Sequence, residues 1–230
     1  MSNLIWGTGS KARVINEYLK ELNGKGADFF FDKYCNEIEF QCEGILINNE
    51  NELIRLQKSV TDFIVCIGNT YGYERYSISK VLETNFLWNP IEIIDSNNFI
   101  DKTVRVGKGC QILPGAVINK FVKIGDYNII NCNSTIDHEC SLGNGIHIMG
   151  SSAITGKVVI EDFVTVGTNA TILPGIKIGE GSIIGAGSVI TKNVDPYSVY
   201  AGVPGKKIKD IKKQENINDV EIIKKLLYKV

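Results

Sequence analysis

One hydrophobic position recurs every six residues through the second half of the chain. From Ile94 to Ile190 each sixth residue is Ile, Leu or Val, seventeen times in succession. Chance agreement over such a run is on the order of one in a billion, so the pattern is a genuine repeat. A period of six fits neither the 3.6-residue turn of an α-helix nor the alternation of a simple hairpin. It predicts a prism in which each hexad forms one short strand and one corner, so that three hexads make an 18-residue coil.

The other hexad positions agree with this prism. The aliphatic residue is expected to point inward and stack on its equivalents, and Gly often follows it directly. Four residues after each aliphatic position the side chain is mostly small, as at Val104, Cys110, Ala116, Val122, Asn128, Ser134, Cys140, Val164, Ala170, Ser182 and Ser188. From Ile94 to about residue 195 the repeat predicts roughly five and a half coils, with no long insertion.

The first ninety residues follow a different pattern. Apolar runs and helix-like spacings alternate in the order β-α-β-β-α-β-α, which predicts a small, mostly parallel α/β unit of the Rossmann-like type. In such a unit ligands bind at the carboxyl ends of the strands. The expected strands cover residues 4–6, 28–31, 44–47 and 63–67, and the expected helices cover 14–22, 53–57 and 73–83.

A glycine turn follows the first expected strand. The run Gly7-Thr8-Gly9-Ser10-Lys11-Ala12 matches only part of the dinucleotide fingerprint, so a purely structural tight turn remains open beside phosphate binding. Amides at a helix N-terminus attract phosphate, and Asp32 is spaced to take ribose hydroxyls. The turn alone would equally support a dehydrogenase, but ninety residues leave no room for a complete dinucleotide fold.

Composition excludes several classes of protein. The 230 residues carry a net charge of -1, which argues against a general nucleic-acid binder. No signal peptide and no membrane span are expected, so we expect a cytoplasmic protein. The six cysteines form no C-x-x-C pair and are expected to be free thiols. Two histidines cannot form a three-histidine zinc site, and no metal is expected.

The whole chain resembles the bacterial sugar acetyltransferases that join a nucleotide-sugar domain to a left-handed parallel β-helix. This family includes sialic acid O-acetyltransferases and the nucleotide-sugar N-acetyltransferases of the bacillosamine and perosamine pathways. The resemblance covers about residues 3 to 209. It is carried by Gly7-Thr8-Gly9, Ile67-Gly68-Asn69, Asn131, Thr135-Ile136-Asp137-His138-Glu139-Cys140 and Ala201-Gly202-Val203-Pro204-Gly205-Lys206.

The resemblance implies that His138 is the catalytic base. Neutral imidazole suits this role near pH 7, and the hexad places His138 near a corner, projecting outward. Either Glu139 or Asp137 would hydrogen-bond the far ring nitrogen, and the resemblance favours Glu139. Because strand residues alternate in direction, only one of the two carboxylates is expected to reach the ring.

Coil arithmetic places Gly156 eighteen residues after His138, directly above it in the next coil. The resemblance implies that its backbone N–H stabilises the thioester oxyanion, and a corner glycine with a purely structural role is the alternative.

His147 lies half a coil from His138 on another face. The resemblance implies a role near the acetyl donor, and an exposed polar side chain is the alternative. Asn131 matches a substrate-contacting asparagine of the family, but it could equally be a structural filler.

The resemblance also implies acetyl-CoA as co-substrate, bound in a groove between neighbouring prisms of a homotrimer. Its candidate contacts are His147, Gly156, Ala186, Gly187, Val203, Pro204 and Lys206, with Lys206 and Lys207 near its phosphates. The candidate contacts of the nucleotide-linked sugar are Gly7, Gly9, Ser10, Lys11, Asp32, Gly68, Asn69 and Asn131. Relatives often have His where this chain has Lys11, so we expect Lys11 to pair with the diphosphate instead.

These observations predict three parts: a nucleotide-sugar-binding α/β domain (1–90), a β-helix acetyltransferase domain (91–204) and a tail with a capping helix (205–230). The predicted function is acetyl transfer from acetyl-CoA to the amine of a nucleotide-linked amino-deoxy sugar in glycan biosynthesis, by direct attack in a ternary complex. A sugar O-acetyltransferase of the sialic-acid type is the near alternative. A non-catalytic trimeric nucleotide-binding scaffold is an alternative of another class.

Overall fold

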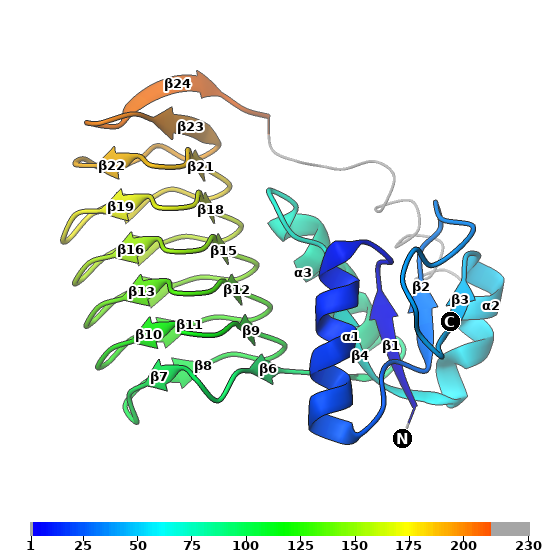
Figure 1. Cartoon of the computed structure of the whole chain (residues 1–230). Helices are drawn as coiled ribbons and strands as arrows, with labels where there is room; N and C mark the ends of the chain where they lie inside the picture. Colours follow the sequence, from blue (N-terminus) through cyan, green and yellow to red (C-terminus); the bar gives the residue numbers. More distant parts are fainter. Residues whose placement is uncertain (1, 213–230) are drawn as a thin grey trace. The chain divides into compact units, whose positions relative to one another are not determined.

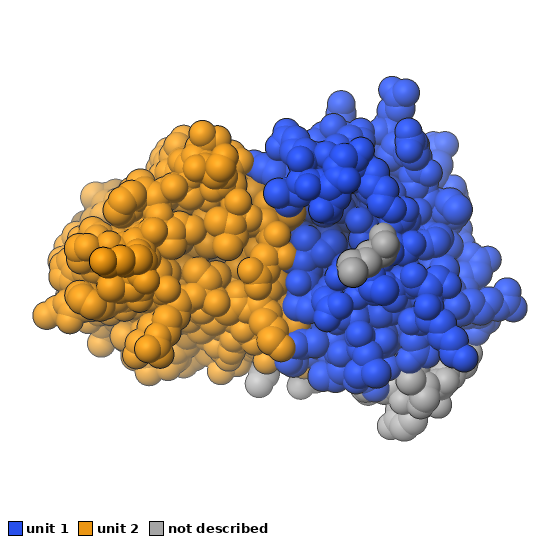
Figure 2. Space-filling model, turned by 90° about the horizontal axis from the view of Figure 1, so that it is seen from below, with its two compact units in different colours: residues 1–68, 77–91, 215–230 blue, residues 69–76, 92–214 orange. Residues whose placement is uncertain are grey.

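A computed structural model describes residues 2–212 of the protein. Its contacts divide this part of the chain into two compact units, shown in different colours in Figure 2. The first unit comprises residues 2–68 and 77–91, and the second comprises residues 69–76 and 92–212. The capping helix expected near residues 217–227 lies outside the described residues.

The first unit is built on a five-stranded parallel sheet of order β3-β2-β1-β4-β5. Its strands are β1 (Ser2–Trp6), β2 (Phe29–Phe31), β3 (Ile45–Ile47), β4 (Val60–Val65) and β5 (Asn89–Pro90). The apolar runs expected from the sequence form its centre, where Leu4, Ile5 and Phe30 are fully buried. The strand order reverses between β1 and β4, which is the position where sheets of this type bind ligands.

Helices α1 (Ser10–Asn23), α2 (Glu50–Arg55), the 3-10 helix η1 (Leu56–Lys58) and α3 (Gly72–Thr84) complete the element order. Helix α1 buries Ala12, Ile15 and Leu19 on one face. The sequence spacing predicts the burial of Ile15 and Leu19, but Val14 and Leu22, which belong to the same spacing, are exposed. It ends at Gly24, whose left-handed backbone caps the helix. The expected alternation of strands and helices is confirmed, and β5 is an addition.

The second unit is a parallel β-helix with three flat faces (Figure 1). The first face contains β6 (Ile93–Ile94), β9 (Gln111–Ile112), β12 (Ile129–Ile130), β15 (His147–Ile148), β18 (Thr165–Val166), β21 (Ile183–Ile184), β23 (Ser198–Ala201) and β24 (Lys206–Asp210). The second contains β7 (Phe99–Ile100), β10 (Val117–Ile118), β13 (Thr135–Ile136), β16 (Ala153–Ile154), β19 (Thr171–Ile172) and β22 (Val189–Ile190). The third contains β8 (Arg105–Val106), β11 (Lys123–Ile124), β14 (Ser141–Leu142), β17 (Val159–Ile160) and β20 (Lys177–Ile178).

Strand pairing confirms the 18-residue coil. Val117 pairs with Thr135, and Thr135 pairs with Ala153. The aliphatic positions from Ile112 to Ile190 form one continuous buried core. The first coil departs from this pattern: Ile100 and Val106 are only partly buried, and Ile94 is 43% exposed. These residues lie at the end of the β-helix, where no preceding coil covers them.

The three faces differ in the side chains that point outward. The third face carries Arg105, Lys123 and Lys177. The second face carries only uncharged residues, namely Phe99, Val117, Thr135, Ala153, Thr171 and Val189. On the first face Gln111, Ile129, His147 and Thr165 are buried. We call the corner line between the first and second faces the first edge, and that between the second and third faces the second edge.

Among residues 2–212, none of the helices combines the length and the apolar character needed to cross a bilayer.

The inward ladder gives the first prediction. Ile154→Ala should lower the free energy of unfolding by about 3 kcal/mol, because it leaves a cavity beside a side chain that is 1% exposed. Ile94→Ala makes the same chemical change at the exposed end of the ladder and should cost less than about 1 kcal/mol. Urea unfolding followed by circular dichroism measures both values. Equal losses in the two variants would contradict the stacked ladder.

Candidate active site

His138 lies on the second edge, directly after β13, with its side chain 48% exposed. Its Nδ1 lies 3.0 Å from Oε2 of Glu139. Asp137 does not take part in this contact: its Oδ1 accepts the backbone N–H of His138 at 2.7 Å and the Asn119 amide at 3.0 Å. The ring therefore meets one carboxylate, that of Glu139, as the sequence led us to expect. An acceptor at Nδ1 leaves Nε2 as the basic nitrogen of the neutral ring.

Gly156 lies in the next coil against the imidazole of His138. A Cβ atom at this position would fall 2.6 Å from Nε2, so only glycine leaves the ring in place. This is the stacking that coil arithmetic predicts.

The backbone N–H of Gly156 differs from its equivalents in the coils below. At Lys120 and at His138 the N–H is accepted by the preceding side chain, Asn119 or Asp137. At Gly156 the preceding residue is Thr155, whose hydroxyl donates instead to the carbonyl of Ile172 at 2.6 Å. Within residues 2–212 the N–H of Gly156 has no acceptor. A basic nitrogen thus packs against a glycine whose backbone N–H is vacant, and acyl transfer uses a base and an oxyanion donor of this kind.

Cys140 follows His138 by two residues but is not poised as a nucleophile. Its thiol donates to the carbonyl of Thr155 at 3.0 Å, and burial raises its pKa to about 11. The thiol therefore stays protonated near neutral pH, and only the thiolate is strongly nucleophilic. The geometry favours direct transfer over an acyl-cysteine intermediate.

A shallow groove of about 270 Å³ runs across the second face up to the residue before His138. Its lining residues come from three successive coils and are Val117, Asn119, Thr135, Ile136, Asp137, Ile154 and Thr155. This groove is uncharged except for Asp137, so it offers room for a neutral part of a ligand beside the candidate base.

A second cluster lies at the first edge. Nδ2 of Asn131 is 2.7 Å from Nε2 of His147, and Nδ1 of His147 is 3.0 Å from the carbonyl oxygen of Asn69. His147 is only 6% exposed, so the alternative of an exposed polar side chain is wrong. The sequence analysis gives Asn69, Asn131 and His147 as candidate ligand contacts, but it does not predict that they contact one another. The domain boundary predicted from the sequence puts the segment Asn69–Tyr76 in the first domain, but this segment belongs to the unit of the β-helix.

The remaining candidate contacts of the acetyl donor lie toward the end of the β-helix. Ala186 and Gly187 are exposed on the first edge after β21, where space around Gly187 is open. Val203 and Pro204 are exposed in the turn before β24. Lys207 pairs with Asp195 and Asp210, and these carboxylates raise its pKa. Lys206 forms no ion pair with any described residue, so it is the better candidate for a phosphate contact.

In the first unit, most candidate contacts of the nucleotide lie at the carboxyl edge of the sheet. Gly7, Gly9, Ser10 and Lys11 follow β1, Asp32 follows β2 and Gly68 follows β4. The Thr8 hydroxyl donates to Oδ2 of Asp32 at 2.8 Å, which ties the two loops together. Gly7 has a φ of +113°, a conformation that favours glycine, and Gly9 has open space where a Cβ would stand.

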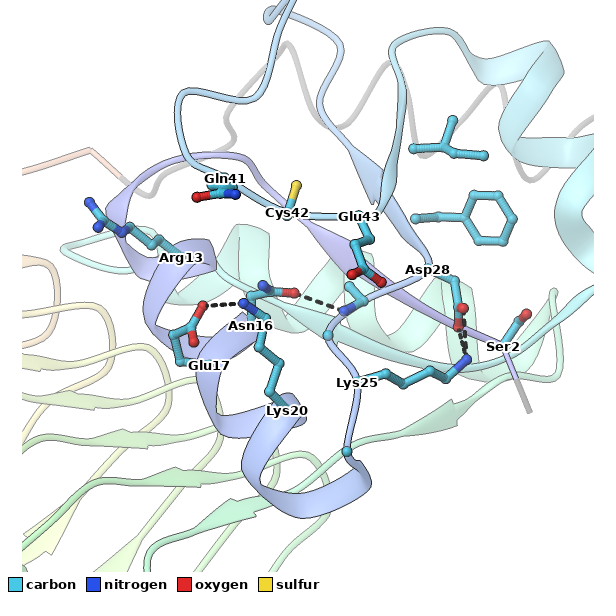
Figure 3. A pocket seen from close by; sticks show the side chains of 15 residues that line it. Ser2, Arg13, Asn16, Glu17, Lys20, Lys25, Asp28, Gln41, Cys42 and Glu43 are labelled. Carbon is cyan, nitrogen blue, oxygen red and sulfur yellow. Dashed lines mark hydrogen bonds and ion pairs between the residues drawn. The ribbon is translucent and has the colours of Figure 1, made fainter.

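A hollow of about 920 Å³ at the opposite edge of this sheet was not predicted (Figure 3). Its charged side chains largely pair with one another, as Lys20 does with Glu17 and Lys25 with Asp28. Asn16 holds its floor by accepting the backbone N–H of Ala27 at 2.8 Å. These contacts indicate that the lining residues hold the connection between α1 and β2 in place. No periodic signal in the sequence marks it.

Metal ligands are not grouped in the part of the chain that the structure describes: no three His, Cys, Asp or Glu side chains there are placed to hold an ion.

Comparison with known protein families gives one match. The family described as "Bacterial transferase hexapeptide (six repeats)" matches residues 103–138 and 157–192, which lie within the β-helix. No curated protein matches the chain in sequence.

Solved structures share the fold over nearly the whole chain. The PerB protein of Caulobacter crescentus, solved with CoA and GDP-perosamine, has a TM-score of 0.81 and 25% identity over 91% of this chain and 98% of its own. An alanine variant of one histidine of that GDP-perosamine N-acetyltransferase gives a TM-score of 0.82 with the same identity and coverage. The acetyltransferase domain of PglB from Neisseria gonorrhoeae, solved with acetyl coenzyme A, has a TM-score of 0.79 and 22% identity over 90% of this chain and 98% of its own.

The expected fold class is confirmed: a Rossmann-like α/β domain is followed by a left-handed parallel β-helix of hexapeptide repeats. The resemblance to bacterial sugar acetyltransferases of this type is confirmed with it.

The stacking at the second edge gives the next prediction. Gly156→Ala should displace the His138 ring, because the new methyl group would lie 2.6 Å from Nε2. Gly150→Ala is the matched control on the first edge, where a Cβ would lie 3.4 Å from the nearest atom. Crystal structures of both variants measure the His138–Glu139 contact. An unmoved ring in Gly156→Ala would contradict this geometry.

Proposed function

We propose that the protein is an acetyl-CoA-dependent N-acetyltransferase that acetylates the amino group of a nucleotide-linked amino-deoxy sugar. One observation carries the proposal: the ring of His138, paired with Glu139, packs against Gly156, whose backbone N–H has no acceptor among residues 2–212. The fold shared with the Caulobacter N-acetyltransferase, solved with CoA and GDP-perosamine, supports the same chemistry.

The residues of the second edge account for each step. The sugar amine attacks the carbonyl carbon of the acetyl thioester, and Nε2 of His138 accepts the proton that the amine loses. Glu139 stabilises the resulting imidazolium through Nδ1–H. The N–H of Gly156 binds the oxyanion of the tetrahedral intermediate. Collapse breaks the carbon–sulfur bond, and the departing thiolate of CoA takes the proton from His138.

Acetyl-CoA is proposed to lie along the first edge, with Ala186, Gly187, Val203 and Pro204 beside its pantetheine arm and Lys206 near its phosphates. The exposure of these residues supports this placement. The nucleotide is proposed to bind Gly7, Gly9, Ser10, Lys11, Asp32 and Gly68 at the carboxyl edge of the first sheet, where amides at the start of α1 attract phosphate.

We propose a homotrimer, because the two halves of the site lie on different edges of one prism. His138 and Gly156 follow strands of the second face, whereas Asn131, Ala186 and Gly187 precede strands of that face. Around a three-fold axis that the second face approaches, the second edge of one protomer meets the first edge of the next. The uncharged outward residues of the second face suit such burial.

A cytoplasmic location is proposed as well, since six free cysteines suit a reducing compartment.

Replacing the base tests the proposed reaction. His138→Ala should lower the turnover of acetyl-CoA with nucleotide-linked amino sugars by about two to four orders of magnitude. Lys102→Ala changes an exposed residue at the same hexad position two coils away and should leave turnover unchanged. Release of CoA thiol, measured with UDP-, dTDP- and GDP-linked amino sugars, gives the rates.

The same assay separates the alternatives. Turnover with free sialic acid, and none with amino sugars, would show that the protein is an O-acetyltransferase and would refute the proposed N-acetylation. Absence of turnover together with no thermal stabilisation by acetyl-CoA would favour the scaffold. Full activity of His138→Ala would refute the base.

The trimer has its own test. Ala153→Lys places a charge on the uncharged second face and should yield monomers in sedimentation experiments. Ser141→Lys makes a similar change on the third face, which already carries lysines, and should leave the trimer intact. If the Ser141 variant dissociates and the Ala153 variant does not, the interface lies on the third face, and the proposed arrangement is wrong.

A further inference from the structure

The hydrogen bonds of His147 determine which ring nitrogen carries its proton. A backbone carbonyl can only accept, so Nδ1 must be the nitrogen that donates to Asn69 across 3.0 Å. In the neutral ring Nε2 then has only a lone pair. The atom facing it at 2.7 Å must donate, which assigns that position to the amide nitrogen of Asn131.

This assignment fixes the other half of the Asn131 amide. With Nδ2 turned to the ring, the amide oxygen Oδ1 points away from His147. Within residues 2–212 this oxygen accepts no hydrogen bond, and Asn131 is partly exposed. The first edge therefore presents a fixed acceptor to a ligand, whereas both nitrogens of His147 are occupied.

The carbonyl of Asn69 is itself held firmly. Thr165 donates to it at 3.2 Å. Arg75 lies six residues after Asn69 in the chain, and it is only 1% exposed. Its guanidinium donates to the carbonyls of Tyr127, Gly145 and Ile146 at 2.9, 2.7 and 3.1 Å. Burial lowers the pKa of Arg75 to about 10, so it remains charged at neutral pH.

Packing adds to these bonds. A side chain at Gly72 would collide with the backbone of Gly145, so the two chain segments approach as closely as backbones allow. Tyr73 and Tyr76 both contact the ring of Phe163, with centroid distances of 5.3 and 5.6 Å. The segment Asn69–Tyr76 is thus a clamp on the first face of the β-helix and on the corner line that precedes this face.

We infer that His147 is a positioning residue: the clamp fixes its Nδ1–H tautomer, and the ring in turn fixes Asn131 so that Oδ1 accepts an N–H group of the ligand. Under the proposed function, two sources could supply that group, namely the amides of the pantetheine arm and the amine of the acceptor sugar. The identity of the ligand rests on the proposed function, whereas the tautomer of His147 rests on its hydrogen bonds alone.

The chain offers a clean spectroscopic test, because His138 and His147 are its only histidines. Histidine labelled with ¹⁵N in the full-length protein gives two ring patterns, and His138→Ala assigns them. We expect His147 to show a protonated Nδ1 and an unprotonated Nε2. Thr165→Val removes the weaker bond to Asn69 and should leave the pattern unchanged. A proton on Nε2 of wild-type His147 would overturn the inference.

Asn131→Asp sharpens the test. An aspartate cannot donate to Nε2, so His147 should become doubly protonated at pH 7. If Asn131 had instead accepted from Nε2–H, the aspartate would replace it without change in the ring. An unaltered His147 pattern in this variant would therefore overturn the inference. This readout needs no substrate, so it stands or falls separately from the acetylation assay.

Kinetics identify the source of the N–H group. Arg75→Met should weaken the clamp, give His147 a mixed tautomer pattern and lower kcat/KM about tenfold, with Arg75→Lys partly restoring both. A rise in KM for acetyl-CoA assigns the contact to the pantetheine amides, and a rise in KM for the sugar assigns it to the amine. If Arg75→Met does not fold, the Asn131→Asp spectrum decides alone. A folded Arg75→Met protein with wild-type spectra and kinetics would contradict the role of the clamp.

Discussion

Apolar stacking along the inside of the β-helix is the interaction on which the rest of this structure depends. Each coil advances by 18 residues, so one aliphatic side chain lies directly on the next from Ile112 to Ile190. Burial of each such side chain contributes about 1.5–3 kcal/mol. Because a slip of one residue would turn the whole ladder outward, the register is strongly specified. Every residue at an edge therefore has a defined neighbour one coil above and one below.

That regularity explains which parts of the site could be predicted from the sequence. The contact between His138 and Gly156 follows from counting eighteen residues, and the outward direction of His138 follows from its place in the hexad. The parallel sheet of the first unit follows from its apolar runs. The choice of Glu139 over Asp137 came from family resemblance, and the structure shows its reason: Asp137 is bound to the backbone of its neighbour.

Other parts of the site carry no periodic signal. Asn69 and His147 are 78 residues apart, and nothing in either local pattern indicates that they meet. Arg75 looks like an ordinary helical residue in the sequence, yet it binds carbonyls 52 to 71 residues away. The exposure of Ile94 also escaped prediction, because a repeat describes the middle of a stack and not its end. Contacts made once depend on tertiary packing, which a repeat does not encode.

The pairing of His138 with Glu139 shows how the fold serves the chemistry. Adjacent residues in a strand point to opposite sides, so neighbours in sequence do not normally share a hydrogen bond between side chains. Glu139 has a φ of +59°, in the left-handed region, and this turn brings its carboxylate to the ring. The conformation costs a non-glycine residue about 1–2 kcal/mol. It recurs every six residues, from Phe121 through Tyr127, Asn133 and Glu139, because each corner of the β-helix requires it. The corner that turns the chain between two faces is therefore also the device that orients the base, and the stacked core below it stabilises both.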